Sequence, residues 1–403
     1  PLSPNGLYPF HLDILLQRVE RRENKENYYK KHNYDEVTFS WRPFQLAFIL
    51  LTFESLFNES SDERDTVDLL WVSTGGGKTE AYLFAIAATI IQDRLSREKE
   101  NAKFGVTVIM RYTLRLLTTQ QFSRAAAMIC ALEYMRMHRS DLGNEPISLG
   151  LWIGNKSTPG TKEEARKLLK DMGGKDNIDL AIKENQFQVL ECPWCHQANS
   201  IIPENNNFGS AGWGYKLIRR SKSKFDMQCL NKDCPFCSGL PINVIDETIY
   251  RNRPTLLFST VDKFAQVPLK KGASNLFGSF VKGLSRPKLV IQDELHLISG
   301  PLGSIVGLYE SGFDYILKSS GSRPKYIAST ATIKNSDDQI RNLFNRKVFQ
   351  FPPDGIDQAD NFFVKEDESK SGRKYVGVMG TGKTQVTTEV RLLAPMIACI
   401  KML

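Results

Sequence analysis

Val67-Asp68-Leu69-Leu70-Trp71-Val72-Ser73-Thr74-Gly75-Gly76-Gly77-Lys78-Thr79-Glu80 is the stretch that decides the fold of this chain. Residues 67–72 form an apolar run short enough for a buried parallel strand. Three glycines then let backbone N–H groups turn around an anion, and residues 79–97 read as a helix. The stretch therefore predicts a strand, a phosphate-binding loop and a helix whose positive end faces the phosphates.

The side chains of this loop suggest which ligand it binds. Lys78 can neutralise the β- and γ-phosphates of ATP, and the Thr79 hydroxyl can ligate Mg²⁺. Val72 replaces the first glycine of the strict phosphate-loop pattern, so a glycine-rich turn with an incidental Lys-Thr pair is the alternative. The residues expected to contact the nucleotide here are Ser73, Thr74, Gly75, Gly76, Gly77, Lys78, Thr79 and Glu80.

Length and composition allow a multidomain globular protein. The 403 residues are 41% hydrophobic and 24% charged, with a formal net charge of +8, which hints at a polyanionic partner. No apolar run reaches membrane-spanning length, and the N-terminus does not resemble a signal peptide. Five of the seven cysteines crowd into residues 192–237, which favours metal binding in a reducing compartment such as the cytoplasm. We also expect the chain to be part of a longer protein.

Trp41-Arg42-Pro43-Phe44-Gln45 opens a helix predicted to run to about residue 57. The amide of Gln45 could pair with the edge of adenine while Phe44 or Trp41 stacks on the ring. The alternative is a helix start with core aromatic residues.

Residues 104–110 predict a second parallel strand, followed by a helix over roughly residues 118–137. Ligands bind at the carboxyl ends of strands in such sheets, and Arg111, Thr113 and Arg115 lie there. Guanidinium and hydroxyl groups suit a nucleic-acid backbone. An ordinary basic loop would look similar.

Residues 288–292 predict a buried strand that ends in Asp293-Glu294-Leu295-His296. Adjacent carboxylates at this position suit nucleotide hydrolysis: Asp293 holds Mg²⁺ and Glu294 polarises the attacking water. His296 is placed to sense the γ-phosphate. After a further strand over residues 325–328, the hydroxyls of Thr330 and Thr332 can couple this site to a neighbouring domain, although a helix-capping turn is the alternative.

Two cysteine pairs interrupt the alternation of strands and helices. We expect Cys192, Cys195, Cys229 and Cys234 to hold one Zn²⁺, with Cys237 as a substitute for Cys229. Reduced buried cysteines and an iron–sulfur cluster are the alternatives. Between the pairs, basic residues alternate with aromatic ones, so this segment is either a nucleic-acid face or a solvated hairpin; those that carry the pattern are Trp213, Tyr215, Lys216, Arg219, Arg220, Lys222, Lys224 and Phe225.

Residues 377–384, Gly-Val-Met-Gly-Thr-Gly-Lys-Thr, match the strict phosphate-loop pattern better than residues 73–79 do. No acidic strand end follows them, so nothing after Lys383 could hold Mg²⁺. We therefore interpret this segment as the first strand and turn of a second domain.

Together these motifs resemble those of superfamily 2 DExH helicases. Gln45 matches the Q motif, residues 73–79 motif I, residues 111–115 motif Ia, and residues 293–296 motif II, with residues 330–332 as motif III. The resemblance assigns Thr260 and Lys263 to motif Ib and thus to nucleic-acid binding. Motif III reads Thr-Ala-Thr rather than Ser-Ala-Thr. Motifs IV to VI, with their arginine fingers, are absent, which puts hydrolysis by this portion alone in doubt.

The layout is similar, more narrowly, to the helicases of bacterial DISARM anti-phage systems, which implies DNA and a partner subunit of the same system. An RNA helicase and a non-catalytic zinc-containing nucleic-acid-binding module are the rival functions. The expected fold is α/β: a RecA-like parallel sheet flanked by helices, with a zinc-ribbon-like insertion, forming the N-terminal part of a two-RecA-domain helicase. The expected divisions are a helical region at 1–66, the sheet in two parts at 67–149 and 244–350, the insertion at 150–243, and a linker with the start of a second domain at 351–403.

Overall fold

The computed structural model describes most of the chain from residue 41 onward. The described residues are 41–72, 76–96, 104–113, 115–154, 157–174, 178–197, 199–203, 212–218, 224–277, 284–330, 336–353 and 377–400, with 355, 362 and 363. The chain divides into two compact units, Pro1–Pro353 and Asp354–Leu403.

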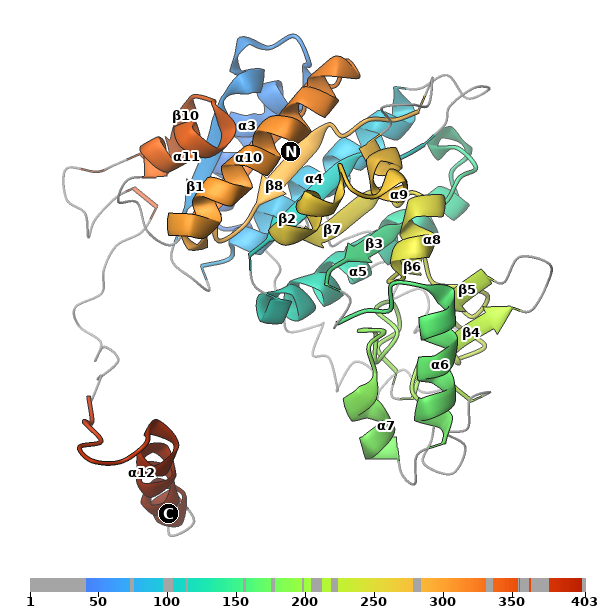
Figure 1. The fold of residues 1–403 in the computed structure, drawn as a ribbon. Helices are drawn as coiled ribbons and strands as arrows, with labels where there is room; N and C mark the ends of the chain where they lie inside the picture. The colour runs from blue at the N-terminus through green and yellow to red at the C-terminus, as the bar shows by residue number, and fades with distance from the viewer. Residues whose placement is uncertain are drawn as a thin grey trace. The chain divides into compact units, whose positions relative to one another are not determined.

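An eight-stranded sheet lies at the centre of the first unit (Figure 1). Every pairing in this sheet is parallel, so the carboxyl ends of all its strands lie along one edge. In spatial order the strands are β10 (Val348–Phe351), β1 (Val67–Trp71), β9 (Lys325–Thr330), β8 (Leu289–Gln292), β2 (Val108–Tyr112), β7 (Leu256–Thr260), β3 (Leu149–Trp152) and β6 (Ile242–Asn243).

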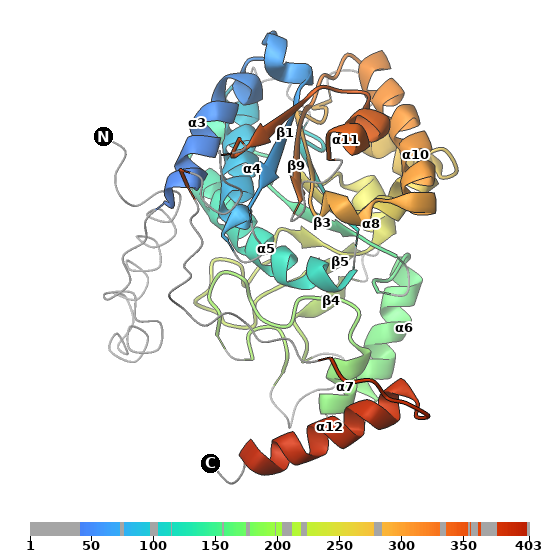
Figure 2. The same ribbon diagram turned by 90° about the vertical axis from the view of Figure 1, so that its left-hand side faces the viewer.

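Helices cover both faces of the sheet, as expected for parallel strands whose residues are mostly buried. Figure 2 shows α3 (Pro43–Phe57), α4 (Lys78–Leu95) and α5 (Arg115–Met137) on one side, with α8 (Asp246–Arg251), α10 (Gly300–Ser319) and α11 (Ser336–Phe344) on the other. The short helices η1 (Asp62–Asp65), η2 (Ser140–Leu142), η3 (Val261–Gln266), α9 (Lys271–Ser274), η4 (Asn275–Phe277) and η5 (Leu295–Leu297) complete this part of the unit. None of the helices in the described ranges is long and apolar enough to cross a membrane.

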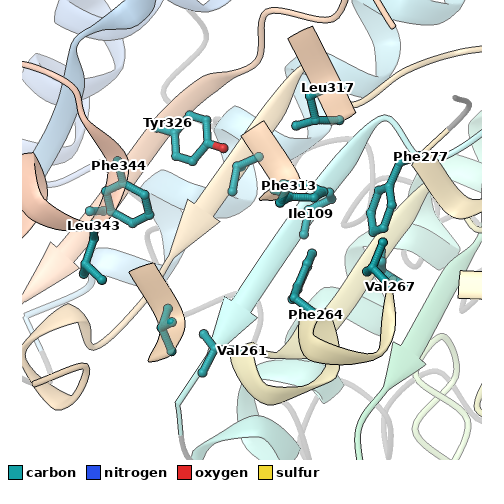
Figure 3. Packing of buried hydrophobic residues seen from close by; sticks show 14 of the residues in the cluster. Ile109, Val261, Phe264, Val267, Phe277, Phe313, Leu317, Tyr326, Leu343 and Phe344 are labelled. Atoms are coloured by element: carbon teal, nitrogen blue, oxygen red, sulfur yellow. The ribbon is translucent and has the colours of Figure 1, made fainter. Parts of the chain in front are cut away.

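Aliphatic and aromatic side chains together fill the core between the sheet and the α10 face (Figure 3). Phe313 of α10 packs edge to face against Phe264 and Phe277, with ring centroids 5.1 and 4.8 Å apart. Edge-to-face pairs add about 0.5–1.5 kcal/mol beyond the apolar area that they bury. This packing fixes α10 over the strands that carry the candidate site.

The strands predicted from the apolar runs are present, with shifted ends. The largest shift concerns residues 104–110, where the strand begins at Val108 and runs to Tyr112. Three strands of this sheet, β3, β6 and β10, were not predicted: they have two to four residues each and, unlike β8, are not continuous apolar runs.

The cysteine-containing segment is an excursion from the β6 edge of the sheet. The insertion expected at residues 150–243 starts inside β3 and ends inside β6, because both ends pair with the sheet. Its own elements are α6 (Lys162–Gly173), α7 (Ile178–Glu184) and an antiparallel hairpin of β4 (Tyr215–Ile218) and β5 (Lys224–Met227).

In the second unit, residues 377–384 form a turn ahead of α12 (Gln385–Ile400). Gly382 takes a φ of +71° in this turn, a conformation that favours glycine. The strand expected at residues 374–378 lies largely outside the described residues.

A buried ion pair anchors the amino-terminal ends of the central strands. Lys325 of β9 is fully buried, with its ammonium 3.1 Å from the Asp68 carboxylate of β1. The same ammonium donates to the carbonyl oxygens of Glu63 and Thr66. Burial raises the pKa of Asp68 to about 6, and Lys325 opposes that rise. Because the folded pKa is raised, the stabilising contribution of Asp68 is complete below its unfolded pKa of 3.8 and is lost as the pH rises through about 6.

We therefore expect Lys325→Met to lower the free energy of unfolding by about 3–5 kcal/mol, because Asp68 is left buried without its partner. The loss should be larger at about pH 8 than at about pH 5, where protonation relieves the unpaired carboxylate. Urea unfolding at both pH values measures this. The double variant Lys325→Met/Asp68→Leu should recover much of the loss. A loss that does not depend on pH would contradict the assignment.

Candidate nucleotide-binding site and metal centre

The phosphate loop leads directly from β1 into α4. Residues 73–75 lie outside the described part of the chain, so the expected contacts of Ser73, Thr74 and Gly75 are not addressed. Gly77 precedes the helix with a φ of +98°, and Lys78 is the first helical residue. The Lys78 ammonium is buried and has no hydrogen-bond partner among the described residues. A buried ammonium in that state is stabilised by an anion, and the helix N-terminus favours negative charge at the same place.

Gln45 fastens α3 to the phosphate loop. Its amide nitrogen donates to the Gly77 carbonyl oxygen (2.7 Å), and its amide oxygen accepts from the Arg42 backbone N–H (2.8 Å). The Arg42 guanidinium donates to the carbonyl oxygen of Gly76 (2.7 Å). The expected stacking of Phe44 on adenine is wrong for this structure, because Phe44 is only 4% exposed. Trp41 is partly exposed and packs edge to face against Phe84.

Asp293 follows β8 and lies at the centre of the carboxyl edge. Its carboxylate accepts hydrogen bonds from the Ser329 hydroxyl of β9 and from the Glu294 backbone N–H. Burial raises the pKa of Asp293, and the Glu294 carboxylate raises it further, whereas the Ser329 hydrogen bond and the nearby Lys78 ammonium lower it. A cation bound at this carboxylate would favour its ionised form.

Glu294 has an unusual backbone conformation, with φ +50° and ψ 48°. A non-glycine residue in the left-handed region costs of order 1–3 kcal/mol, and such strain clusters at functional sites. Its side chain is 15% exposed and lies 3.5 Å from the His296 ring. The two carboxylates have different partners, Ser329 for Asp293 and the His296 ring for Glu294, so they can take separate roles.

His296 connects the acidic turn to the end of β9. Its Nδ1 lies 3.4 Å from the hydroxyl of Thr330, so the residue expected to sense the γ-phosphate contacts one that was expected to act in coupling. Thr332, the other residue expected to act in coupling, lies outside the described residues. Gln339 of α11 donates to the carbonyl oxygens of Leu295 and Ile298 and so holds the acidic turn in place. Nothing in the sequence pointed to Gln339.

Thr79 and Glu80 follow Lys78 in the first turn of α4. Thr79 is buried, at 8% exposed. The Glu80 carboxylate pairs with Arg124 of α5, so this residue links two helices as well as lying beside the loop. Sequence reasoning missed Arg124, because it lies in the middle of a helix with no motif around it.

Three of the five residues expected to bind nucleic acid point into the protein. Arg111 is fully buried and pairs with Glu310 of α10. Lys263 is fully buried and donates to Asp246 (2.6 Å), while Thr260 is only 1% exposed. These three side chains are therefore not offered at the surface in this structure, since residue type alone does not distinguish a surface cation from a buried ion pair.

The other two keep their expected place at the carboxyl edge. Thr113 is partly exposed, and its hydroxyl has no hydrogen-bond partner among the described residues. Arg115 begins α5, and its side chain lies outside the described part.

Four buried cysteines converge in the insertion. The Sγ atoms of Cys192, Cys195, Cys229 and Cys234 all lie within 4.8 Å of one another. The separation is 3.8 Å from Cys192 to Cys234 and 3.6 Å from Cys195 to Cys229. A tetrahedron of thiolates about 2.3 Å from a zinc ion has edges of about 3.8 Å, so the cluster fits one Zn²⁺. Cys237, the expected substitute, is outside the cluster and partly exposed.

The segment between the cysteine pairs has an apolar core. Trp213 and Tyr215 are buried and stack, with ring centroids 6.0 Å apart. They therefore do not form the exposed aromatic surface considered from the sequence. Lys216 is exposed, while residues 219–223 and the side chains of Lys224 and Phe225 lie outside the description.

The cysteine cluster rests on α5. Trp194, within the first cysteine pair, stacks on Tyr134 with ring centroids 4.9 Å apart. The same helix carries Arg124, which pairs with Glu80 at the phosphate loop. One helix thus contacts both the four-cysteine segment and Glu80 beside the phosphate loop.

The fold and the site define an α/β protein with a RecA-like parallel sheet and a four-cysteine insertion, and no protein-family model matches the chain. The chain is similar to DISARM protein DrmA of Bacillus paralicheniformis, with 37% identity over an alignment of 409 positions that covers 89% of this chain. The resemblance expected from the motifs is thus confirmed: the chain is DrmA-like. It spans 35% of the length of that relative.

Solved helicase structures also match. The DUF1998 helicase MrfA bound to DNA and AMPPNP is 14% identical, with a TM-score of 0.43, covering 94% of this chain and 33% of that one. The DEAD-box helicase Mss116 bound to single-stranded RNA is 14% identical, with a TM-score of 0.39, covering 80% of this chain and 41% of that one.

The cluster geometry predicts opposite outcomes for two neighbouring cysteines. Cys234→Ser should release the bound metal, because it removes one of four thiolates, whereas Cys237→Ser should retain it. Elemental analysis of both purified variants measures the metal content. Equal metal content in the two variants would contradict the ligand assignment.

Proposed function

We propose that this chain is the ATP-binding portion of a superfamily 2 DNA helicase or translocase that acts in anti-phage defence. One observation carries the proposal: the buried ammonium of Lys78 has no hydrogen-bond partner among the described residues, and its charge acts on the carboxylate of Asp293. They are brought there by β1 and β8, both neighbours of β9. A cation for phosphate beside a carboxylate for Mg²⁺ is the arrangement that nucleotide hydrolysis requires.

Each side chain has a separate role in this proposal. Lys78 binds the β- and γ-phosphates, while Thr79 and Asp293 hold Mg²⁺. Glu294 orients the attacking water and accepts its proton. Bound Mg²⁺ would neutralise the negative charge that develops on the phosphate oxygens. His296 carries the state of the site to Thr330, with which it is in contact. Gln45 holds the loop in place through the carbonyl oxygen of Gly77, and the same amide remains a candidate for adenine.

DNA is the proposed partner, and its binding is proposed to depend on the carboxyl edge near Thr113 and Arg115. The resemblance to DISARM helicases supports DNA, and the net charge of +8 suits a polyanion. Backbone contacts do not distinguish the sugar, so an RNA helicase is the alternative that the experiment must test. A partner subunit of the same defence system is proposed on the same resemblance.

We propose that the cysteine cluster holds Zn²⁺ as a structural ion. All four ligand positions are sulfur and all four side chains are buried, which suits a closed site without an open coordination position. Such a site is stable where thiols stay reduced, which is consistent with a cytoplasmic location. An iron–sulfur cluster would be recognised by its visible absorbance and by iron in the elemental analysis.

ATP turnover by the full-length protein tests the hydrolytic roles. Lys78→Ala should abolish nucleic-acid-stimulated turnover, because the phosphate charge is no longer neutralised. Glu294→Gln should still bind ATP but turn it over about 10²–10⁴-fold more slowly, because the proton acceptor is lost. Lys383→Ala, in the second phosphate-loop pattern, is the matched control and should leave turnover unchanged. Normal turnover in either of the first two variants would contradict the proposal, and stimulation by RNA alone would replace DNA with RNA.

A comparison of two arginines tests the nucleic-acid edge. Arg115→Ala should weaken DNA binding and reduce the slope of log K against log salt by about 1, with unchanged stability, because one phosphate contact is lost. Arg111→Met should instead lower the free energy of unfolding by about 3–5 kcal/mol, since Glu310 is left buried alone. Fluorescence anisotropy across salt concentrations and urea unfolding measure the two effects. If the Arg111→Met protein is stable but binds DNA less tightly, Arg111 contacts the nucleic acid after all.

A further inference from the structure

A cavity of about 310 Å³ lies at the amino-terminal edge of the sheet, where the segments before β1, β8 and β9 meet. The proposed ATP site lies at the opposite ends of the same three strands. Four of the residues that line the cavity are cationic and one is acidic: Arg64, Arg286, Lys288 and Arg323, with Glu59. None of these residues takes part in the proposed nucleotide chemistry.

Two of the four cations are paired with carboxylates. Arg323 makes two hydrogen bonds to Asp65, and Lys288 lies 3.0 Å from Glu59 and 3.3 Å from Asp93. These contacts use the single acidic residue of the lining, together with two carboxylates from outside it. The other two cations are therefore the source of the unbalanced positive charge in the cavity.

Arg64 is the first of the two cations that contribute this unbalanced charge. It is 1% exposed, and its hydrogen bonds go to carbonyl oxygens, those of Ser55, Leu56, Lys288 and Arg323. Burial lowers its pKa to about 10. A guanidinium has five N–H groups and these bonds use four, so one N–H remains to be offered to a ligand.

Arg286 is the second cation of the lining that has no carboxylate partner described above. Its Nε is buried and has no hydrogen-bond partner among the described residues, although a buried N–H is normally paired. Gly321 makes room for it: a Cβ at that position would lie 2.8 Å from Arg286 Nη1, and the glycine adopts a φ of +78°. The turn before β9 thus leaves room for the guanidinium at the cavity, and its Nε stays without a partner among the described residues.

We propose that this cavity is a second anion-binding site, which takes a phosphate group through Arg286 and the remaining N–H of Arg64. Arginine offers planar, charge-assisted hydrogen bonds that match phosphate oxygens. The phosphate can come from inorganic phosphate or from the 5′ end of a nucleic-acid strand. The site is independent of the phosphate loop, because it lies at the other end of the strands.

Isothermal titration calorimetry with inorganic phosphate tests the site. Every protein used in this titration carries Lys78→Ala, so that phosphate binding at the phosphate loop does not contribute heat. The result therefore does not depend on the proposed ATP site. We expect one phosphate to bind per chain. Arg286→Gln should weaken the binding at least about tenfold, because a charge-assisted hydrogen bond is lost. Arg139→Gln, which removes the same charge from an exposed pair with Asp141, is the matched control and should have no effect.

The source of the phosphate is resolved by a second titration, with a DNA oligonucleotide that carries either a 5′-phosphate or a 5′-hydroxyl. A preference for the phosphorylated strand that disappears in Arg286→Gln identifies a strand end as the ligand. Binding of inorganic phosphate without such a preference identifies a free anion. Arg286→Lys retains the charge and should keep part of the affinity for phosphate. This variant is the control that separates loss of the charge from a folding defect. The proposal is overturned if phosphate does not bind, or if Arg286→Gln and Arg139→Gln weaken it equally.

Discussion

The candidate nucleotide site depends on the lateral pairing of β1, β9 and β8. Trp71 pairs with Thr330 across one interface, and Gln292 pairs with Ala328 across the other. The phosphate loop, the acidic turn and the hydroxyl segment therefore begin within about two residues of one another along the carboxyl edge. That register places the Ser329 hydroxyl against the Asp293 carboxylate. A slip of one residue would turn each of these side chains to the other face and dismantle the site.

At the opposite edge of the sheet, the segments that lead into the strands have backbone carbonyl groups that need hydrogen-bond donors. Carbonyl groups that enter the strands there cannot all be paired within the sheet, and buried ones must find donors. Arg64 and Lys325 supply those donors with side chains that are 1% and 0% exposed. The amino-terminal edge of the sheet is therefore rich in cationic side chains, and the cavity beside Arg286 lies at this edge.

The four-cysteine segment and the nucleotide site share one supporting helix. Tyr134 of α5 stacks on Trp194 beside the metal ligands, and Arg124 of the same helix pairs with Glu80 of α4. Both contacts are made by side chains of one helix, so α5 packs against the four-cysteine segment and against α4 at the phosphate loop. The insertion is therefore joined to the sheet through packing as well as through its two strands.

The sequence by itself determined the local features: the strand–loop–helix around Lys78, the acidic turn at Asp293 and Glu294, and the four cysteines spaced for one metal. Each of these depends on neighbouring residue types, which a sequence displays directly. Only the tertiary structure decided which cysteine stays outside the cluster, that Ser329 and Gln339 support the acidic turn, and that β3, β6 and β10 extend the sheet. It also decided that Arg111 and Lys263 are buried ion pairs, because a basic residue acquires that role only when a carboxylate distant in sequence folds against it.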